Sequence, residues 1–320
     1  MKKMILFLLI CTLLVSACAP QQQSQTSTHT QKTIKIGYLP ITHAANLMMT
    51  KEINEKNKQR NYKIKLVRFN NWPDLMDALN SGRIDGASTL IELAMKSKSK
   101  GAPIKAVALG HHEGNVVLGQ KGHHLHDFKS NHDYSFAIPH RYSTHYLLLE
   151  RMREKLNIQP GHFHYHEMAP AEMPAALSEK RISGYSVAEP FGAIGEKLGK
   201  GQLLQHGSDI IPDAYCCVLV LQEDLIQHNQ KAVHQLMRDY KQAGYDMTDT
   251  KKSVDVMEKN YKQNRKILEQ SAQWTSYGDL TIKEKGYRDI AKSVSEHHLF
   301  EPPSFDSFVD PSLYKEGEFL

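Results

Sequence analysis

Strand-like and helix-like hydrophobic patterns alternate along the chain from residue 33 onwards. Four segments have the apolar or alternating pattern of strands: residues 33–39, 62–69, 84–87 and 104–109. Three segments between them carry apolar residues at helical spacing: residues 44–58, 73–81 and 90–98. Gly82 follows the second of these helices, where a helix C-cap is expected. This alternation predicts an α/β fold in which helices cover both faces of a parallel sheet.

The same pattern repeats in the second half of the chain. Strands are predicted at residues 134–138, 163–166, 182–187 and 215–221. Helices are predicted at residues 142–156, 171–179 and 190–198. A long amphipathic helix follows around residues 233–243, and the remainder up to residue 320 is charged and mostly helical. Two rounds of alternation predict two α/β lobes.

The N-terminus has the pattern of a targeting segment. Residues 1–3 are basic at two positions, and residues 4–17 form an apolar stretch shorter than the roughly 20 residues of a membrane-spanning helix. The small residues Ser16 and Ala17 precede Cys18, which resembles the lipobox of bacterial lipoproteins. That resemblance implies cleavage before Cys18 and acylation of its sulfur, palmitate included. The alternative is an ordinary secretory signal with a chance cysteine.

These features predict a signal peptide at residues 1–17, and a lipidated cysteine with a flexible tether at residues 18–32. The body is therefore expected outside the cytoplasm, anchored by lipid to the bacterial cell membrane. Loss of Lys2 and Lys3 with the signal lowers the formal net charge from +5 to +3. A small positive excess without a polybasic run gives no support for a nucleic-acid partner.

Cysteine usage changes once the signal is set aside. Of the four cysteines, Cys11 leaves with the signal and Cys18 is acylated, so Cys216 and Cys217 remain. Both belong to an apolar run that predicts a buried strand. They are expected to be buried structural cysteines, with a strained bridge between neighbours as the alternative.

Polar residues follow the predicted strands at the ends where parallel sheets bind ligands. Arg141 is the candidate for bidentate pairing with an anion, with a salt bridge to Glu113 or Glu189 as the alternative. The full set of candidate ligand-binding residues is Pro40, Thr42, His43, Trp72, Ser88, Thr89, His111, Glu113, His140, Arg141, Tyr142, Ser143, Thr144 and Glu189.

Several of these candidates have a structural interpretation as well. Thr42 and His43 are equally suited to capping the next helix, and so are Ser88 and Thr89. Glu189 before Pro190 is expected to orient the helix that follows. Trp72 is expected to pack rather than stack on a ligand.

Histidine is unusually frequent, with 18 copies of which 11 lie between His111 and His166. In a strand, His162, His164 and His166 share one face, a geometry that suits a borderline-soft metal. His111 and His112 at the expected cleft are further candidates. We expect no resident metal or cofactor, and specific zinc or nickel binding is the alternative.

Three motifs carry a family resemblance: residues 36–44 (IGYLPITHA), 80–87 (NSGRIDGA) and 187–191 (VAEPF). They resemble the nitrate, sulfonate and taurine type of substrate-binding proteins of ABC importers, which include binders of thiamine-pyrimidine precursors. The resemblance implies a two-lobed type II periplasmic-binding-protein fold with a ligand cleft between the lobes. It places lobe 1 at residues 33–116 and 217–320 and lobe 2 at residues 117–216, with crossings near residues 115–120 and 215–221.

The resemblance implies a monomeric solute-binding lipoprotein that is not an enzyme. It would capture a small polar or anionic solute, such as a sulfonate, nitrate, bicarbonate or a pyrimidine precursor, by closure of the lobes. Its partners would be that solute and the permease subunits of an ABC importer. Motifs of serine hydrolases, P-loop enzymes and zinc proteases are absent from the sequence. A relative of thiamine-pyrimidine synthases would need a cysteine-rich stretch that Cys216 and Cys217 do not supply.

Overall fold

The computed structural model describes residues 31–315. The predicted signal peptide, Cys18 and all of the tether up to residue 30 lie outside the described residues. Within residues 31–315, no helix combines the length and the apolar character needed to cross a membrane.

The first sheet has five strands in the order β2-β1-β3-β11-β4. Their bounds are β1 Lys32–Tyr38, β2 Tyr62–Arg68, β3 Gly86–Leu90, β4 Ile104–Leu109 and β11 Cys217–Gln222. In β1, Ile34 and Ile36 are buried while Thr33 and Lys35 are exposed, so alternation directs one face into the core. Strand β3 is buried throughout, as expected of a central strand covered on both faces.

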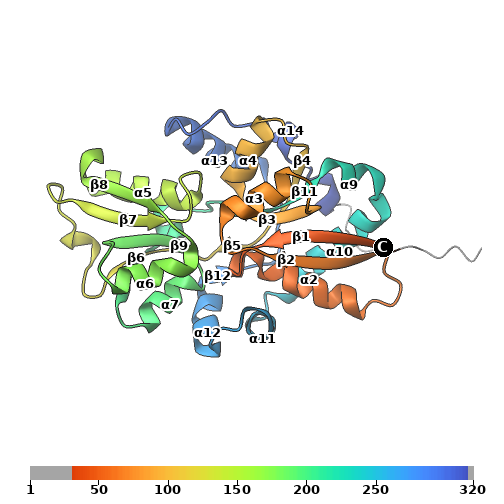
Figure 1. The fold of residues 1–320 in the computed structure, drawn as a ribbon, viewed down its shortest axis with the longest axis horizontal. Coiled ribbons are helices and arrows are strands. Elements are labelled where there is room, and N and C mark those ends of the chain that lie inside the picture. Colours follow the sequence, from red (N-terminus) through yellow and green to blue (C-terminus); the bar gives the residue numbers. More distant parts are fainter. Residues whose placement is uncertain (1–30, 316–320) are drawn as a thin grey trace, which may run out of the picture. The chain divides into compact units, whose positions relative to one another are not determined.

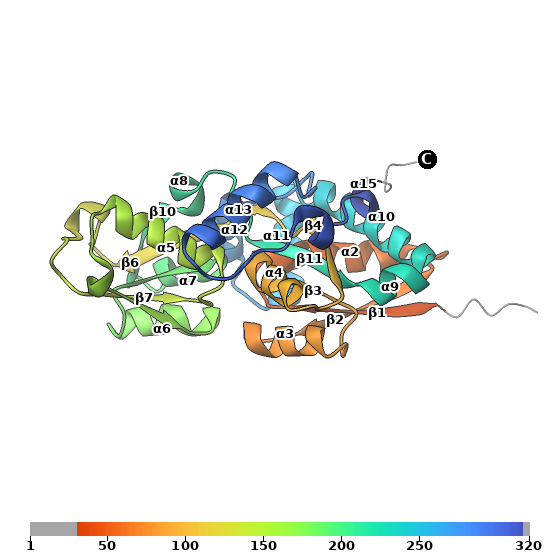
Figure 2. The ribbon, with the colours of Figure 1, turned by 90° about the horizontal axis from the view of Figure 1, so that it is seen from above.

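Helices cover both faces of this sheet. They are α2 Ala45–Lys56, α3 Trp72–Asn80, α4 Ile91–Ser99 and α10 Gln230–Asp246. Figure 2 shows α3 on one side of the strands and α2 with α10 on the other. Helix α3 begins where Asn71 caps it, because the Asn71 side chain accepts a hydrogen bond from the backbone N–H of Asp74 at 2.9 Å.

The second sheet also has five strands, in the order β10-β6-β9-β7-β8. Their bounds are β6 Asn115–Gln120, β7 Tyr134–Ile138, β8 Phe163–Glu167, β9 Gly184–Ala188 and β10 Gly201–His206. Helix α5 (Thr144–Lys155) lies above this sheet in Figure 1, and α6 (Met173–Ser178) and α7 (Phe191–Lys197) lie below it. The sheet is therefore also a middle layer between helices.

The remaining elements are short segments and the C-terminal helices. Short segments are η1 Thr42–Ala44, η2 Leu125–Asp127, η3 Pro160–His162, η4 Pro170–Glu172, β5 His112–Glu113 and β12 Thr275–Ser276. Helices are α8 Gly207–Ile210, α9 Glu223–His228, α11 Thr250–Tyr261, α12 Arg265–Trp274, α13 Glu284–Glu296, α14 Phe305–Phe308 and α15 Ser312–Lys315. The Asn46 side chain donates a hydrogen bond to the Tyr240 carbonyl at 3.0 Å. This bond connects α10 to α2, which covers the first sheet.

The predicted parallel pairs are present in both sheets, but each sheet is mixed because one of its strands is antiparallel to its neighbours. Strand β11 is antiparallel to β3 and β4, and β6 is antiparallel to β9 and β10. These are the strands by which the chain passes from one sheet to the other, and each enters its sheet from the end opposite to its neighbours. Residues 110–114 and 207–216 connect the two sheets, next to the residues at which the crossings are predicted.

Two smaller expectations also differ from the structure. Strand β10 was not predicted, because its residues are only half-buried at a sheet edge and carry little apolar periodicity. The third strand begins at Gly86 and ends at Leu90, so Ser88 and Thr89 lie inside the strand rather than after it.

Candidate functional site

The ends of the parallel strands of both sheets meet in the middle of the described structure (Figure 1). The backbone N–H of Thr42, just after β1, donates to the carbonyl of Glu189, just after β9, at 2.8 Å. Residues brought there from distant parts of the sequence form what we call the buried polar cluster: His43, Glu92, His111, Thr144, His145, Cys216 and Cys217. Each of these residues is at most 4% exposed.

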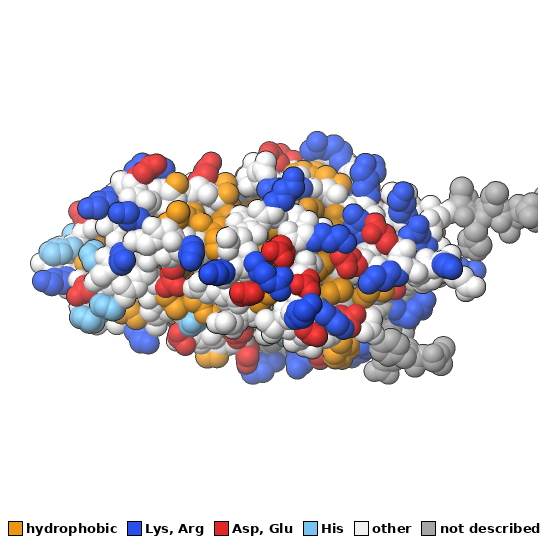
Figure 3. Space-filling model, turned by 90° about the horizontal axis from the view of Figure 1, so that it is seen from below, with side chains coloured by type: hydrophobic (Ala, Val, Ile, Leu, Met, Phe, Trp, Pro, Cys, Tyr) orange, Lys and Arg blue, Asp and Glu red, His pale blue; other side chains and the backbone are white. Residues whose placement is uncertain are grey.

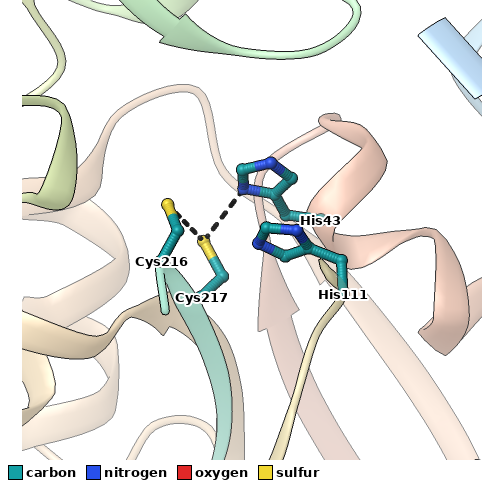
Figure 4. Close-up of side chains that lie close together, drawn as sticks. All are labelled: His43, His111, Cys216 and Cys217. Carbon is teal, nitrogen blue, oxygen red and sulfur yellow. Dashed lines mark hydrogen bonds between the residues drawn. The ribbon is translucent and has the colours of Figure 1, made fainter. Parts of the chain in front are cut away.

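Two histidines and two cysteines form the centre of this cluster (Figure 4). The Nδ1 atom of His43 lies 3.4 Å from the Sγ atom of Cys217, and the two sulfur atoms of Cys216 and Cys217 are 3.9 Å apart. The rings of His43 and His111 are stacked, with centroids 3.3 Å apart and planes 9° apart. Both cysteines are free, so the vicinal bridge considered from the sequence is not formed.

Glu92 and Thr144 connect the cluster to the second sheet. The Oγ1 atom of Thr144, at the start of α5, lies 2.6 Å from Glu92 Oε1 and 2.6 Å from the carbonyl oxygen of Tyr215. Burial raises the pKa of Glu92 to about 8. The Thr144 hydroxyl is the donor in both contacts, so its single proton is shared between the Glu92 carboxyl and the Tyr215 carbonyl.

The imidazoles of the cluster are uncharged at neutral pH. Burial lowers the pKa of His111 and of His145 to about 3, and it lowers the pKa of His43 well below its ordinary value. Both ring nitrogens of His111 and of His145 lack a hydrogen-bond partner among the described residues, as does Glu92 Oε2. Buried polar atoms without partners are rare in folded proteins, and each needs a partner such as a water molecule, an ion or a ligand.

Two cavities lie beside this region. One, of about 220 Å³, is lined by Pro40 and Ile41 after β1, by Arg68 at the end of β2, and by Pro170 and Phe191. The other, of about 380 Å³, is lined by His111, His112, Glu113 and Tyr215 together with residues of the C-terminal part. The expected residues Pro40, His111 and Glu113 therefore all border open space.

The polar run after β7 lies at the start of α5. Ser143 caps α5, where its hydroxyl accepts from the Tyr146 N–H at 3.2 Å. His140 Nδ1 accepts from the Tyr142 N–H at 3.0 Å, and the ammonium of Lys96 lies 3.2 Å from the centre of the Tyr142 ring. Arg141 is exposed, with its guanidinium 4.7 Å from the centre of the Tyr146 ring, so it lies apart from the buried polar cluster.

The helix-cap interpretation does not hold for the candidates of the first sheet. Thr42 and His43 lie within η1, whose N-cap is Ile41, while Ser88 and Thr89 lie within β3. The Thr42 hydroxyl is 3.1 Å from that of Thr275.

The two packing interpretations agree with the structure. Trp72 is 2% exposed at the start of α3. The carboxylate of Glu189 accepts hydrogen bonds from the Ser271 hydroxyl at 2.6 Å and from the Ala193 N–H at 3.2 Å, which orients α7.

Most of the other histidines lie on the surface of the second sheet. Figure 3 shows them gathered at the end that carries the β6–β7 connection and β8. His164 and His166 share one exposed face of β8, whereas His162 precedes the strand and its Nδ1 lies 2.6 Å from Asp133 Oδ1. His112 Nε2 is 2.7 Å from the Asp279 carbonyl oxygen. Of the candidate metal ligands suggested by the sequence, only His111 belongs to the buried polar cluster.

Sequence reasoning did not include Glu92, His145 or the two cysteines among the ligand contacts. Glu92 follows the apolar stretch of β3, where a carboxylate is unusual, and that is the signal that could have identified it. His145 was one of many histidines, and Cys216 and Cys217 were interpreted as structural because their neighbours are apolar. Their convergence depends on the antiparallel entry of β11, which local pattern does not reveal.

Comparison with known proteins places the chain in a family. The model of the NMT1-like family matches residues 27–258. The ligand-binding component of an ABC-type import system from Staphylococcus aureus, whose structure was solved with zinc bound, is 67% identical with a TM-score of 0.89, over 90% of this chain and 99% of that chain.

More distant solved structures share the fold. The periplasmic nitrate-binding protein NrtA from Synechocystis is 16% identical with a TM-score of 0.79, over 90% of this chain and 88% of that one. The alkanesulfonate-binding protein SsuA from Xanthomonas axonopodis, bound to MOPS, is 16% identical with a TM-score of 0.72, over 87% and 98% of the two chains.

A curated relative contains a comparable region within a longer protein. The bicarbonate transport ATP-binding protein CmpC of Synechocystis is 25% identical over 209 residues, which are 60% of this chain and 31% of the relative. The chain therefore spans about a third of the length of that relative. Together the family match and the shared fold confirm the resemblance seen in the sequence: this chain belongs to the NMT1-like family and has the periplasmic-binding-protein fold of the substrate-binding components of ABC-type import systems.

Proposed function

We propose that this protein captures a small solute at the buried polar cluster and delivers it to the membrane subunits of an ABC importer. The observation that carries the proposal is a set of buried polar atoms, near the junction between the sheets, that have no hydrogen-bond partner within residues 31–315. His111 lies in the connecting segment 110–114, Glu92 lies in α4 beside the first sheet, and His145 lies in α5 on the second sheet. A ligand that meets these atoms offsets a cost of about 1–3 kcal/mol for each of them.

The mechanism is closure of two lobes around the solute. We propose lobes that correspond to the two sheets, with residues 110–114 and 207–216 as the connections. The solute would contact His43 and His111 on one side and His145 on the other only when the lobes are closed. Because binding then favours the closed form, closure can report occupancy to the permease. The proposed role includes no chemical conversion of the solute.

The chemistry of the cluster narrows the class of solute. Burial lowers the pKa of its imidazoles and raises the pKa of its carboxyl, which favours the uncharged form of each, and Arg141 lies outside it. These groups suit a polar neutral molecule or a metal ion better than a lone anion held by a guanidinium. The Staphylococcus aureus relative with bound zinc gives a second reason to include divalent metals among the solutes.

A thermal-unfolding screen tests capture. The protein is heated with nitrate, bicarbonate, alkanesulfonates, pyrimidine precursors and divalent metals in turn. A true ligand at 100 times its Kd should stabilise the fold by about 2.7 kcal/mol. His145→Gln should reduce the shift, whereas the matched His164→Gln on the exposed face of β8 should leave it unchanged. Absence of any stabilising solute, or a shift equal in both variants, would refute capture at this site.

Delivery and anchoring are proposed on separate grounds. We propose that the chain acts outside the cytoplasm as a monomer, held to the membrane by a lipid on Cys18, because the sequence before it has the order of a lipoprotein signal. Cys18→Ser should release the protein from the membrane fraction and abolish labelling by palmitate. Loaded protein should stimulate ATP hydrolysis by the cognate importer in vesicles, and an equal response to the unloaded protein would contradict delivery.

A further inference from the structure

Four side chains of the buried polar cluster have the composition of a metal site. His43, His111, Cys216 and Cys217 each offer one nitrogen or sulfur atom, and these four atoms all lie within 4.8 Å of one another. Each of the four residues is buried. Figure 4 shows them converging from the segments after β1 and β4 and from the start of β11.

Two of the six separations among the four ligand atoms are close to the edges of a tetrahedron around zinc. With Zn–S near 2.3 Å and Zn–N near 2.0–2.1 Å, a tetrahedral ion requires about 3.8 Å between two sulfurs and about 3.6 Å between sulfur and nitrogen. The sulfurs of Cys216 and Cys217 are 3.9 Å apart, and Cys217 Sγ lies 3.4 Å from His43 Nδ1. These two edges need little change to accommodate an ion, and the remaining separations among the four atoms are all within 4.8 Å.

The hydrogen bonds of His43 leave the correct nitrogen available. Its Nε2 lies 3.3 Å from the carbonyl oxygen of Gly114, which can only accept, so Nε2 carries the proton. Nδ1 then presents a lone pair toward Cys217. A ligating histidine whose other nitrogen donates to a backbone carbonyl is the arrangement typical of protein metal sites.

His111 supplies the second, independent observation. Its side chain stacks on His43, and neither ring nitrogen makes a hydrogen bond of normal geometry to another described residue, although the backbone of His112 and Glu113 lies close to the ring. A buried imidazole left in this state is destabilising, and a metal ion is a partner that satisfies it without adding a further side chain. Because the lone pairs of parallel stacked rings do not converge, the His111 ring has to turn out of the stack to reach an ion bound by His43.

We propose that Cys216, Cys217, His43 and His111 bind one borderline-soft divalent cation, of which zinc is the best fit. The inference rests on the proposed function and deepens it, because it names the class of ligand held in the cleft. On binding, each thiol loses its proton to solvent and forms a metal–sulfur bond, so two protons leave for each ion bound. Two thiolates and two neutral imidazoles give a neutral zinc complex, which lowers the cost of burying the ion. Sulfur and imidazole ligands disfavour magnesium, calcium and manganese.

Cobalt and zinc titration of the whole protein tests the site. The reduced, metal-free protein is titrated with Co²⁺ and then with Zn²⁺. One equivalent of Co²⁺ should give a sulfur-to-cobalt charge-transfer band and the intense visible bands of a tetrahedral ion, and Zn²⁺ should remove both. Cys216→Ala with Cys217→Ala should abolish the charge-transfer band and lower zinc affinity by more than about 100-fold. The matched surface pair His164→Gln with His166→Gln should retain both properties.

The outcomes separate this inference from the proposed function. If zinc affinity survives in the cysteine variant and falls in the surface variant, binding is adventitious and the inference is wrong. If a solute stabilises the protein equally with and without the cysteines, capture stands and the metal site is wrong. If neither solute nor metal binds, both proposals fail. Should the cysteine variant not fold, as judged by circular dichroism, His111→Asn is measured instead, and unchanged zinc affinity in that variant refutes the four-ligand site.

Discussion

The Nδ1 atom of His43 lies 3.4 Å from the Sγ atom of Cys217, although 174 positions separate these residues along the chain. The contact forms because β1 and β11 belong to the same sheet with opposite directions: β1 ends, and β11 begins, at the edge that faces the second sheet. It places an imidazole lone pair beside a thiol in a buried setting, and the candidate site is built around this pair.

The close approach of Gly110 to the His43 backbone can be tested by adding one methyl group. A Cβ atom at Gly110 would lie 2.4 Å from the carbonyl oxygen of His43. We expect Gly110→Ala to displace η1 and to lower the free energy of unfolding by about 1–3 kcal/mol. Urea denaturation measures this change. Gly161→Ala is the control, because nothing lies within 4 Å of a Cβ there; equal stability of the two variants would contradict the model of the site.

Thr144 joins α5 to the first sheet. Thr144→Val keeps the shape of the side chain but leaves the Tyr215 carbonyl and the Glu92 carboxyl without their partner. We expect a loss of about 1–3 kcal/mol in the free energy of unfolding, measured by urea denaturation. Thr33→Val makes the same change at an exposed position of β1 and should stay within about 0.5 kcal/mol of the parent. A Thr144 variant as stable as the parent would show that this connection contributes nothing.

The carboxyl of Glu189 should make stability depend on pH. Burial raises its pKa from 4.5 to about 7. The folded state then holds the proton more tightly than the unfolded chain, so the contribution is fully present below pH 4.5 and is lost as the pH rises to 7. We expect the parent to lose roughly 2–3 kcal/mol relative to Glu189→Gln between pH 5 and pH 8.

Comparison of variants isolates this effect. Buried histidines such as His145 have a lowered pKa and therefore change stability with pH in the opposite direction, but they contribute equally to parent and variant. The free energy of unfolding is measured for both at each pH. Glu172→Gln, at an exposed position, should follow the parent. If the difference between parent and Glu189→Gln does not vary with pH, Glu189 is ionised in the folded state throughout this range.

A buried hydrogen bond holds α10 on β2. The Tyr62 hydroxyl donates to Asp239 Oδ2 at 2.7 Å, and burial raises the pKa of that carboxyl. We expect Tyr62→Phe to lower the free energy of unfolding by about 1–3 kcal/mol, because the buried carboxyl loses a donor. Tyr245→Phe removes a hydroxyl from a side chain that is 46% exposed and should have little effect. The reverse order of the two losses would contradict this account.

Local sequence pattern was sufficient for most of the elements and for the fold class. The alternation in residues 33–39 corresponds to β1, and the helical spacing in residues 73–81 corresponds to α3. When one face of a strand or helix packs on the core, apolar residues recur along the sequence with the period of that element. The motif around Glu189 and the residues after β1 also identified the family, whose fold the structure shares. The lipid anchor and the lobe boundaries stay predictions.

Only the tertiary structure decided which polar residues meet. Whether a strand pairs parallel or antiparallel with its neighbours cannot be read from its own residues. An apolar run such as residues 217–222 has the same hydrophobic pattern in either direction. Because β11 pairs antiparallel with β3, Cys216 and Cys217 lie beside His43. These two cysteines have apolar neighbours in the sequence, and only this contact makes them candidate metal ligands. The sequence thus determined the elements and the family, while the site arose from long-range pairing that no local pattern contains.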